Sequence, residues 1–104
     1  MSLEMSCLCL DATFGSAYLK AVALALADGA DCYHSCDVAN VGRIARRTEL
    51  SEDEVRDVIS ELEAMGVLIG LAEAKYPRKD PDLAGRLCFD PARLRTLESM
   101  GASS

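Results

Sequence analysis

The strongest local signal in this sequence is a helix that begins after Ser51 and ends before Gly66. Ser51 is followed three residues later by Glu54, the spacing of a capping box, in which each side chain binds the other residue's backbone N–H. An apolar stripe then recurs at three- and four-residue spacing, and the glycine after it is typical of a left-handed helix end. The stripe consists of Val55, Val58, Ile59, Leu62 and Met65. We therefore predict a helix over residues 52–65.

Two weaker helix patterns precede this one. Thr13 is a suitable N-cap for a first helix that runs to Gly29 and carries few charges, so most of its surface should be buried. Asp37 is a suitable N-cap for a second helix over residues 38–47, with apolar positions on one side and arginines on the other. Gly42 inside the second helix lowers its stability by about 1 kcal/mol relative to Ala.

Two strands and a short helix are predicted after Gly66. Residues 67–71 and 86–90 are β-prone apolar runs, and the polar tract between them contains two prolines, which fits a hairpin with a long loop. Asp90 then caps a last helix that begins at Pro91 and places Leu94, Leu97 and Met100 on one face before Gly101.

These elements predict a mainly α protein with a small β-hairpin, an α+β fold. A chain of 104 residues, half of them apolar and about a quarter charged, fits one ordinary globular domain. We place this domain at residues 13–100, between an N-terminal extension over residues 1–12 and a tail over residues 101–104. The first three residues of the extension have the character of a vector-derived segment, with Met5 as an alternative start, and this stretch does not enter the fold prediction.

The order helix, turn, helix, hairpin carries a family resemblance. Residues 43–62 resemble the helix-turn-helix of winged-helix transcription regulators of prokaryotes, with small Ala45 where two helices cross. The string ELEAMGVLIGL is similar to the family's passage from the third helix into the wing. The resemblance implies a three-helix core, a wing and a short C-terminal helix. Glu49 departs from the pattern, because it stands where the family most often has Gly in a left-handed turn. The apolar positions shared with the family are Ile44, Leu50, Val55 and Val58.

Charge is distributed very unevenly along the chain. Residues 51–65 hold six acids and one base, a local charge of −5, whereas the other eleven acids and ten bases sum to −1. Nearly all of the net charge of −6 therefore lies on the helix that the resemblance assigns to DNA recognition. Because DNA affinity depends on cations that displace counterions from phosphates, this helix should be repelled by DNA. The acids are equally well explained as a solvated face that complements the helix dipole.

The basic residues that remain as candidates for nucleic-acid binding lie in the second helix and in the wing, with one more on the third helix. They would contact phosphates or the minor groove. Around the wing prolines, the same charges are also explained as a soluble loop that discourages strand pairing at a sheet edge. The candidates are Arg43, Arg46, Arg47, Arg56, Lys75, Arg78, Lys79 and Arg86.

Two functions follow from these features. The first is a non-enzymatic winged-helix regulator that binds double-stranded DNA weakly, in a salt-dependent way, through the second-helix arginines and the wing. The alternative is an interaction adaptor that presents the acidic third helix to a basic protein partner. We expect no catalysis, because no nucleophile lies next to a base and His34 has no identifiable acid partner.

The cysteines suggest a third, less favoured function, a thiol- or metal-responsive regulator. Cys32, His34 and Cys36 provide soft ligands within five residues, but Cys7 and Cys9 are too close for a typical zinc pair. We therefore expect no metal and no cofactor. Five cysteines are an odd number, so reduced thiols are the default, with Cys9 and Cys88 as buried side chains.

The terminal segments bear on location and assembly. No apolar run approaches the ~20 residues of a membrane span and the first residues carry no basic leader, so we expect a cytoplasmic protein without membrane contact. Apolar residues at both ends require a partner surface, and we predict that a second copy of the chain provides it in a homodimer. Packing within the chain, against Phe14 and Tyr18, is the alternative. The apolar residues at the two ends are Leu3, Leu8, Leu10, Leu94, Leu97 and Met100.

Overall fold

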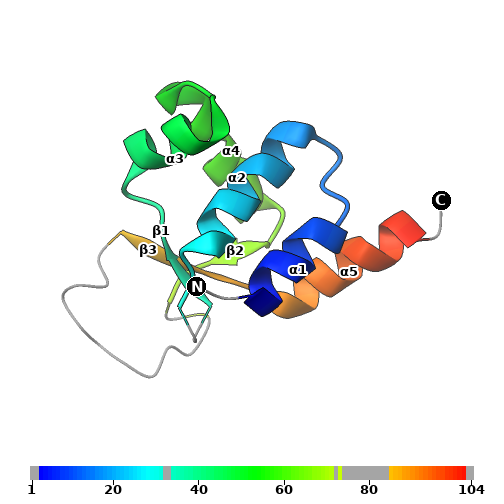
Figure 1. The fold of residues 1–104 in the computed structure, drawn as a ribbon. Helices are drawn as coiled ribbons and strands as arrows, with labels where there is room; N and C mark the ends of the chain where they lie inside the picture. The colour runs from blue at the N-terminus through cyan, green and yellow to red at the C-terminus, as the bar shows by residue number, and fades with distance from the viewer. Residues whose placement is uncertain (1–2, 32–33, 72, 74–84, 103–104) are drawn as a thin grey trace.

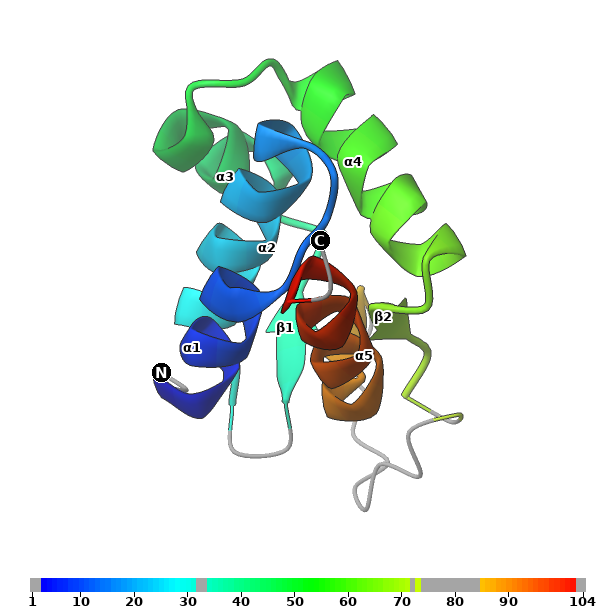
Figure 2. The same ribbon diagram turned by 90° about the vertical axis from the view of Figure 1, so that its right-hand side faces the viewer.

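The computed structural model describes residues 3–31, 34–71, 73 and 85–102. This part of the chain is mainly helical with a small antiparallel sheet, as the sequence predicts (Figure 1). The α3–α4 pair lies at one end of the molecule and the α1–α5 pair at the other, with α2 between them (Figures 1 and 2). The elements in chain order are α1 (Leu3–Asp11), α2 (Ala17–Asp28), β1 (Ser35–Asp37), α3 (Val41–Thr48), α4 (Glu52–Ala64), β2 (Leu68–Ile69), β3 (Arg86–Phe89) and α5 (Pro91–Ala102).

The sheet has three strands in the order β1-β3-β2, and both pairings are antiparallel. The predicted hairpin is the β2–β3 pair, in which Leu68 lies opposite Phe89. Strand β1 was not predicted. It pairs with the other edge of β3, with Ser35 opposite Cys88, so β3 is the central strand. A three-residue strand has too little alternation to be recognised locally, because its conformation depends on the strand beside it.

Helix α2 begins later than the sequence suggested. The predicted N-cap Thr13 instead donates its backbone N–H to the Leu97 carbonyl at 3.3 Å, which ties the segment before α2 to α5. Gly15 follows with a φ of +84°, and Ser16 is the N-cap, accepting the Tyr18 N–H at 3.2 Å. The prediction of a Thr13 cap was wrong because Ser16, another capping residue, lies just after the glycine turn.

Helix α3 also begins three residues later than predicted. Asp37 ends β1, and its carboxylate accepts the Ala39 N–H at 2.8 Å in a short turn. The N-cap is Asn40, whose side chain accepts the Arg43 N–H at 3.3 Å. The proposed Asp37 cap was therefore wrong, because the segment after Asp37 first has to leave the sheet.

Helix α4 matches its prediction closely. The capping box is present, with the Glu54 N–H donating to Ser51 Oγ at 3.1 Å and the Ser51 N–H donating to Glu54 Oε1 at 3.2 Å. At the other end, Gly66 has a φ of +79° and the Val67 N–H reaches back to the Leu62 carbonyl at 3.0 Å, a Schellman ending. Arg93 of α5 donates Nε to the Met65 carbonyl at 2.7 Å, so it satisfies a terminal carbonyl of this helix.

The N-terminal segment is part of the core. Residues 3–11 were set aside as an extension, but they form α1, which packs against α2 and α5 and buries Met5 and Cys9 completely (Figure 2). Lys20 of α2 donates Nζ to the Leu10 carbonyl at 2.7 Å, and Arg95 of α5 approaches Glu4 to 3.7 Å. Helix α1 therefore closes the end of the molecule opposite α3 and α4.

Helix α5 begins at Pro91, where Asp90 Oδ1 accepts the Ala92 N–H at 3.1 Å, as predicted. It continues through Gly101, one of the residues expected to lie in the tail. Leu94 and Leu97 are buried within the chain, whereas Leu3, Leu10 and Tyr18 are the exposed large apolar residues of the described part. The chain itself therefore covers Leu94 and Leu97, whereas the side chain of Met100 lies outside the part of the structure that is described. No described helix is long and apolar enough to cross a lipid bilayer.

Candidate functional site

The α3–α4 pair is joined by a short turn whose geometry is strained at one residue. Glu49 adopts left-handed backbone angles, φ 60° and ψ 24°, at the end of α3. A side chain in this region is destabilised, which is why glycine is preferred there. The small and apolar residues between the two helices, Ile44, Ala45, Val55 and Val58, are buried.

Helix α4 presents a strongly acidic surface to solvent. All six of its acidic residues are exposed, and only Arg56 opposes them. Arg56 lies 3.7 Å from Glu52 and 3.1 Å from Asp53, and Glu54 serves in the capping box. The remaining three acids have no partner among the described residues and extend along the helix as Asp57, Glu61 and Glu63.

Three of the candidate basic residues, Lys75, Arg78 and Lys79, lie outside the described residues. The other five are Arg43, Arg46 and Arg47 on α3, Arg56 on α4 and Arg86 on β3. Arg56 is held by acids of its own helix, as described above. Arg47 donates Nη2 to Asp28 Oδ2 of α2 at 2.8 Å, which links α3 to α2.

Arg86 is part of a hydrogen-bonded network that connects β3, β1 and Asp31. It donates Nε to Ser35 Oγ at 2.9 Å and Nη2 to the Ser35 carbonyl at 3.0 Å. Ser35 is completely buried and in turn donates its backbone N–H and its hydroxyl to the two carboxylate oxygens of Asp31, at 2.9 and 2.8 Å. Arg86 also lies 4.0 Å from Asp31, so this arginine fixes β1 against β3.

Arg43 and Arg46 differ from these arginines. Both are exposed, and neither side chain has a hydrogen-bond or ion-pair partner among the described residues. They are separated by one turn of α3 and line an open groove of about 550 Å³ between α3 and the N-terminus of α4, together with Ser51 and Glu52. These two side chains are therefore the described candidates with all of their side-chain donors available to a ligand.

The other described basic side chains are engaged within the chain. Lys20 and Arg93 donate to helix carbonyls, and Arg95 faces Glu4. Their positions explain why the count of basic residues in the sequence overstates the number that an external anion can reach.

The thiols are mostly buried. Burial raises the pKa of Cys9 to about 12 and that of Cys36 to about 12, and it also raises the pKa of Cys88. These thiols therefore stay protonated near neutral pH, and thiolate is the form that binds metals. Cys7 is exposed, whereas Cys32 lies outside the described residues. Among the described residues, no three His, Cys, Asp or Glu side chains come close enough to hold a metal ion.

His34 occupies an unusual backbone conformation, with a φ of +66°. Its N–H donates to the Asp31 carbonyl at 3.0 Å and its carbonyl accepts the Phe89 N–H at 2.9 Å. Its Nδ1 is buried with no hydrogen-bond partner in the described part of the chain. The two backbone bonds hold this residue at the edge of β1.

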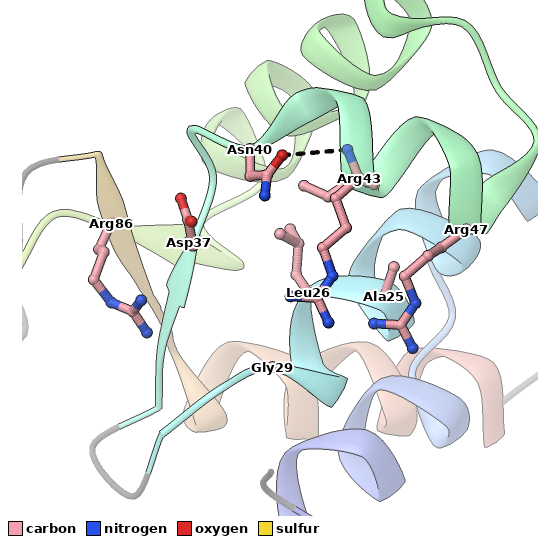
Figure 3. A pocket seen from close by; sticks show the side chains of 9 residues that line it. Ala25, Leu26, Gly29, Asp37, Asn40, Arg43, Arg47 and Arg86 are labelled. Carbon is pink, nitrogen blue, oxygen red and sulfur yellow. Dashed lines mark hydrogen bonds between the residues drawn. The ribbon is translucent and has the colours of Figure 1, made fainter.

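A second concavity, of about 180 Å³, lies on the inner side of α3 (Figure 3). Arg43 and Arg47 enter it from α3 and Arg86 from β3, while Asp37 and Asn40 line it where β1 leads into α3. The sequence identified the three arginines one by one but did not indicate that they share a pocket, and it missed Asp37 and Asn40 as lining residues. Asp37 and Asn40 flank the connection from β1 to α3, and this is the only sequence feature that could have suggested that they line a pocket.

Comparisons with models of known protein families, with curated proteins and with solved structures find no match for this chain.

Proposed function

We propose that the chain is a winged-helix module that acts by binding a partner rather than by catalysis. The order of its elements supports this architecture, because a helix and a strand precede the α3–α4 pair and two strands follow it. The pairing of β1 with β3 also supports it, since it places the end of the first strand directly before α3. In this interpretation α4 is the third helix of the core, and β2 and β3 flank the wing.

The proposed partner is a protein with a basic binding segment, and the docking surface is the exposed face of α4. The observation that carries this proposal is the charge of α4, six exposed acids against one arginine that is already paired within the helix. Complementary charge steers association and selects partners, so this face favours a cationic segment. Asp57 and Glu61 are one helical turn apart and have no partner among the described residues, so they are central to the surface.

DNA binding through α3 is the second candidate. The specific observation in its favour is that Arg43 and Arg46 lie unpartnered beside the groove between α3 and α4. Against it, three of the five described candidate arginines already have partners within the chain, and any phosphate near this groove also meets the acids of α4. Because phosphate neutralisation supplies most of the affinity for DNA, two free arginines beside a −5 helix support only weak binding.

The test compares an arginine-rich peptide with random duplex DNA as ligands of the full chain. Asp57→Asn with Glu61→Gln should weaken peptide binding about three- to tenfold, because each exposed charge contributes a few tenths to 1 kcal/mol. The matched control is Asp11→Asn with Glu98→Gln, which removes two exposed acids from α1 and α5.

The two double variants carry the same net charge, so a difference between them reports the location of the surface. An equal loss of peptide affinity in both double variants would show that binding depends only on net charge, and the proposal would fail. The DNA-binding candidate would be favoured over the adaptor by a different result. In that result the chain binds duplex DNA tightly, and the binding is lost when Arg43 and Arg46 are both changed to Met.

A further inference from the structure

The pocket on the inner side of α3 is lined by three arginines from two elements. Arg43 and Arg47 extend from α3 over Leu26 and Ala25 of α2 (Figure 3). Arg86 lines the pocket from β3, and in this view β1 lies between its guanidinium group and the other two. Leu26 and Ile44 provide apolar wall, so the pocket combines a cationic rim with an apolar side.

The lining residues themselves are cationic. Three guanidinium groups and the carboxylate of Asp37 give them a charge of +2, in a chain of net charge −6. Two further carboxylates pair with these arginines, Asp28 with Arg47 and Asp31 with Arg86, and including them brings the local charge to zero. The hydrogen bond and the charge of Arg47, together with the charge of Arg43, lower the pKa of Asp28. Arg43 is the arginine of this pocket without an acidic partner among the described residues, so an entering anion is attracted to it first.

The arginines retain hydrogen-bond donors for such an anion. A guanidinium group has five N–H donors in a planar fork. Arg47 uses Nη2 for Asp28, and Arg86 uses Nε and Nη2 for Ser35, which leaves Nη1 of each without a partner among the described residues. Arg43 uses none of its side-chain donors within the described chain. Guanidinium forks match the geometry of carboxylate and phosphate oxygens, and charge-assisted bonds of this kind are strong.

We propose that this pocket binds a small organic anion, with a phosphate or carboxylate group at the arginines and a short carbon skeleton against Leu26 and Ile44. The volume of about 180 Å³ sets the size of the ligand, because drug-sized ligands occupy roughly 300–1,000 Å³. It accommodates an oxyanion and a few carbon atoms but not a whole nucleotide. This inference is independent of the proposed partner of α4, because the pocket and the acidic face involve different residues.

Such a ligand bridges three elements of the fold. Its anionic group contacts α3 through Arg43 and Arg47 and β3 through Arg86, while its apolar part contacts α2. A ligand that binds only the folded chain raises its thermal stability in proportion to the logarithm of its concentration. Binding therefore stabilises the position of α3 relative to α2 and the sheet.

The experiment measures thermal unfolding and ¹H–¹⁵N NMR shifts of the full chain with inorganic phosphate, phosphoglycolate and succinate, against chloride at equal ionic strength. At least one of the two organic anions should bind saturably and shift the amides around Arg43 and Arg86. Arg43→Met should weaken this binding about tenfold or more, because a hydrogen bond to a charged group contributes about 1.5–3 kcal/mol. The anion affinity of Arg43→Lys should lie between those of the parent chain and Arg43→Met, since lysine keeps the charge but lacks the planar fork of donors.

Arg46→Met is the matched control. Arg46 is an exposed, unpartnered arginine on the same helix that lines only the outer groove, so its replacement should leave anion binding unchanged. Saturable binding of neither organic anion would overturn the proposal, whether or not inorganic phosphate binds, and so would equal weakening by both Met variants. If duplex DNA alone shifts the amides of this pocket, the anion is a nucleic-acid backbone phosphate and the small-molecule site is rejected.

Discussion

Helices α3 and α4 are consecutive in the chain and pack on each other, yet they carry opposite charge and are specified in different ways. Residues 41–48 contain three arginines and no acid, a charge of +3, whereas residues 52–64 contain six acids and one arginine, a charge of −5. Their buried faces are nevertheless alike, since both contribute aliphatic side chains to one core. The buried apolar residues of each helix therefore determine how it packs, and the residues exposed to solvent determine what it can bind.

The local signals of the two helices differ as much as their charges. Helix α4 has 13 residues, a capping box at one end and a Schellman ending at the other. Helix α3 has 8 residues, an internal glycine, a single capping bond of 3.3 Å and a strained C-cap. Because isolated helices shorter than about 12–15 residues are marginal in water, α3 depends on contacts with α2 and α4 more than α4 depends on its neighbours.

The largest loss of stability is expected from a substitution on the buried face of α4. Leu62 is completely buried on the inner face of α4, so Leu62→Ala leaves a cavity that the surrounding helices can fill only in part. We expect the free energy of unfolding to fall by about 2–5 kcal/mol, measured by urea denaturation.

Glu63→Ala is the control for this change, because the neighbouring side chain faces solvent and should alter stability by less than about 0.5 kcal/mol. A loss below about 1 kcal/mol for Leu62→Ala would mean that α4 is not anchored through its stripe as the structure describes.

The same contrast explains which parts of the fold the sequence could predict. Helix α4 was predicted nearly to the residue, because its start, its stripe and its end are encoded within residues 51–66. Strand β1 was not, because its conformation depends on pairing Ser35 with Cys88 and on the bond from Arg86 to Ser35, 51 residues apart. Helix α1 was missed because residues 1–12 were placed outside the domain as an extension, although Met5 and Cys9 complete the core.

The candidate site was predictable to a similar extent. The sequence located the basic residues and the acidic helix, but it could not show which arginines are already bound. Arg47 pairs with Asp28 at a separation of 19 residues, and the partner of Arg86 is more distant still. Only the folded chain therefore distinguishes Arg43 and Arg46 from the rest, and only the fold brings Arg43, Arg47 and Arg86 around one pocket.

The next largest change in stability is a gain, expected from replacing the glycine inside α3. A Cβ added at Gly42 would have no atom within 4 Å, so Gly42→Ala introduces no clash and removes backbone freedom from the unfolded chain. We expect a gain in unfolding free energy of about 1 kcal/mol, measured by urea denaturation.

Gly66→Ala provides the opposite case at the end of α4, because the φ of +79° there disfavours any side chain. It should destabilise the chain. A gain at Gly66 would contradict the left-handed ending of α4, and a loss at Gly42 would contradict the unhindered helical position of this residue in α3.

A smaller gain is expected at the turn between the two helices. Glu49→Gly relieves a left-handed conformation that destabilises L-residues by about 1–2 kcal/mol, but glycine also gains about 0.4–1 kcal/mol of freedom in the unfolded chain, so the net stabilisation is about 0.5–1 kcal/mol. Thermal denaturation followed by circular dichroism measures it. Glu49→Ala removes the same charge but keeps the Cβ, and it should therefore give no such gain. If Ala and Gly stabilise equally, the charge of Glu49 and not its backbone is the source of strain.

The smallest effect concerns the ion pair that ties α3 to α2. The hydrogen bond and charge of Arg47, with the charge of Arg43, hold the pKa of Asp28 below its ordinary value. A depressed pKa means that the pair stabilises the fold above the pKa of Asp28 in the unfolded chain, about 3.9, and that this contribution is lost as the pH falls through the lower, folded pKa. Both groups are well exposed to solvent, which screens the interaction.

NMR titration of the Asp28 carboxyl group tests this directly. Arg47→Met should raise the pKa of Asp28 most, because Arg47 supplies both a hydrogen bond and a charge, and Arg43→Met should raise it less. Arg46→Met is the control and should have the smallest effect of the three. In the same series, Asp28→Asn should differ from the parent chain in stability at neutral pH and converge with it at acidic pH. If Arg46→Met shifts Asp28 as much as Arg47→Met does, the charge on α3 acts as a diffuse field, and the contrast between paired and free arginines on this helix fails.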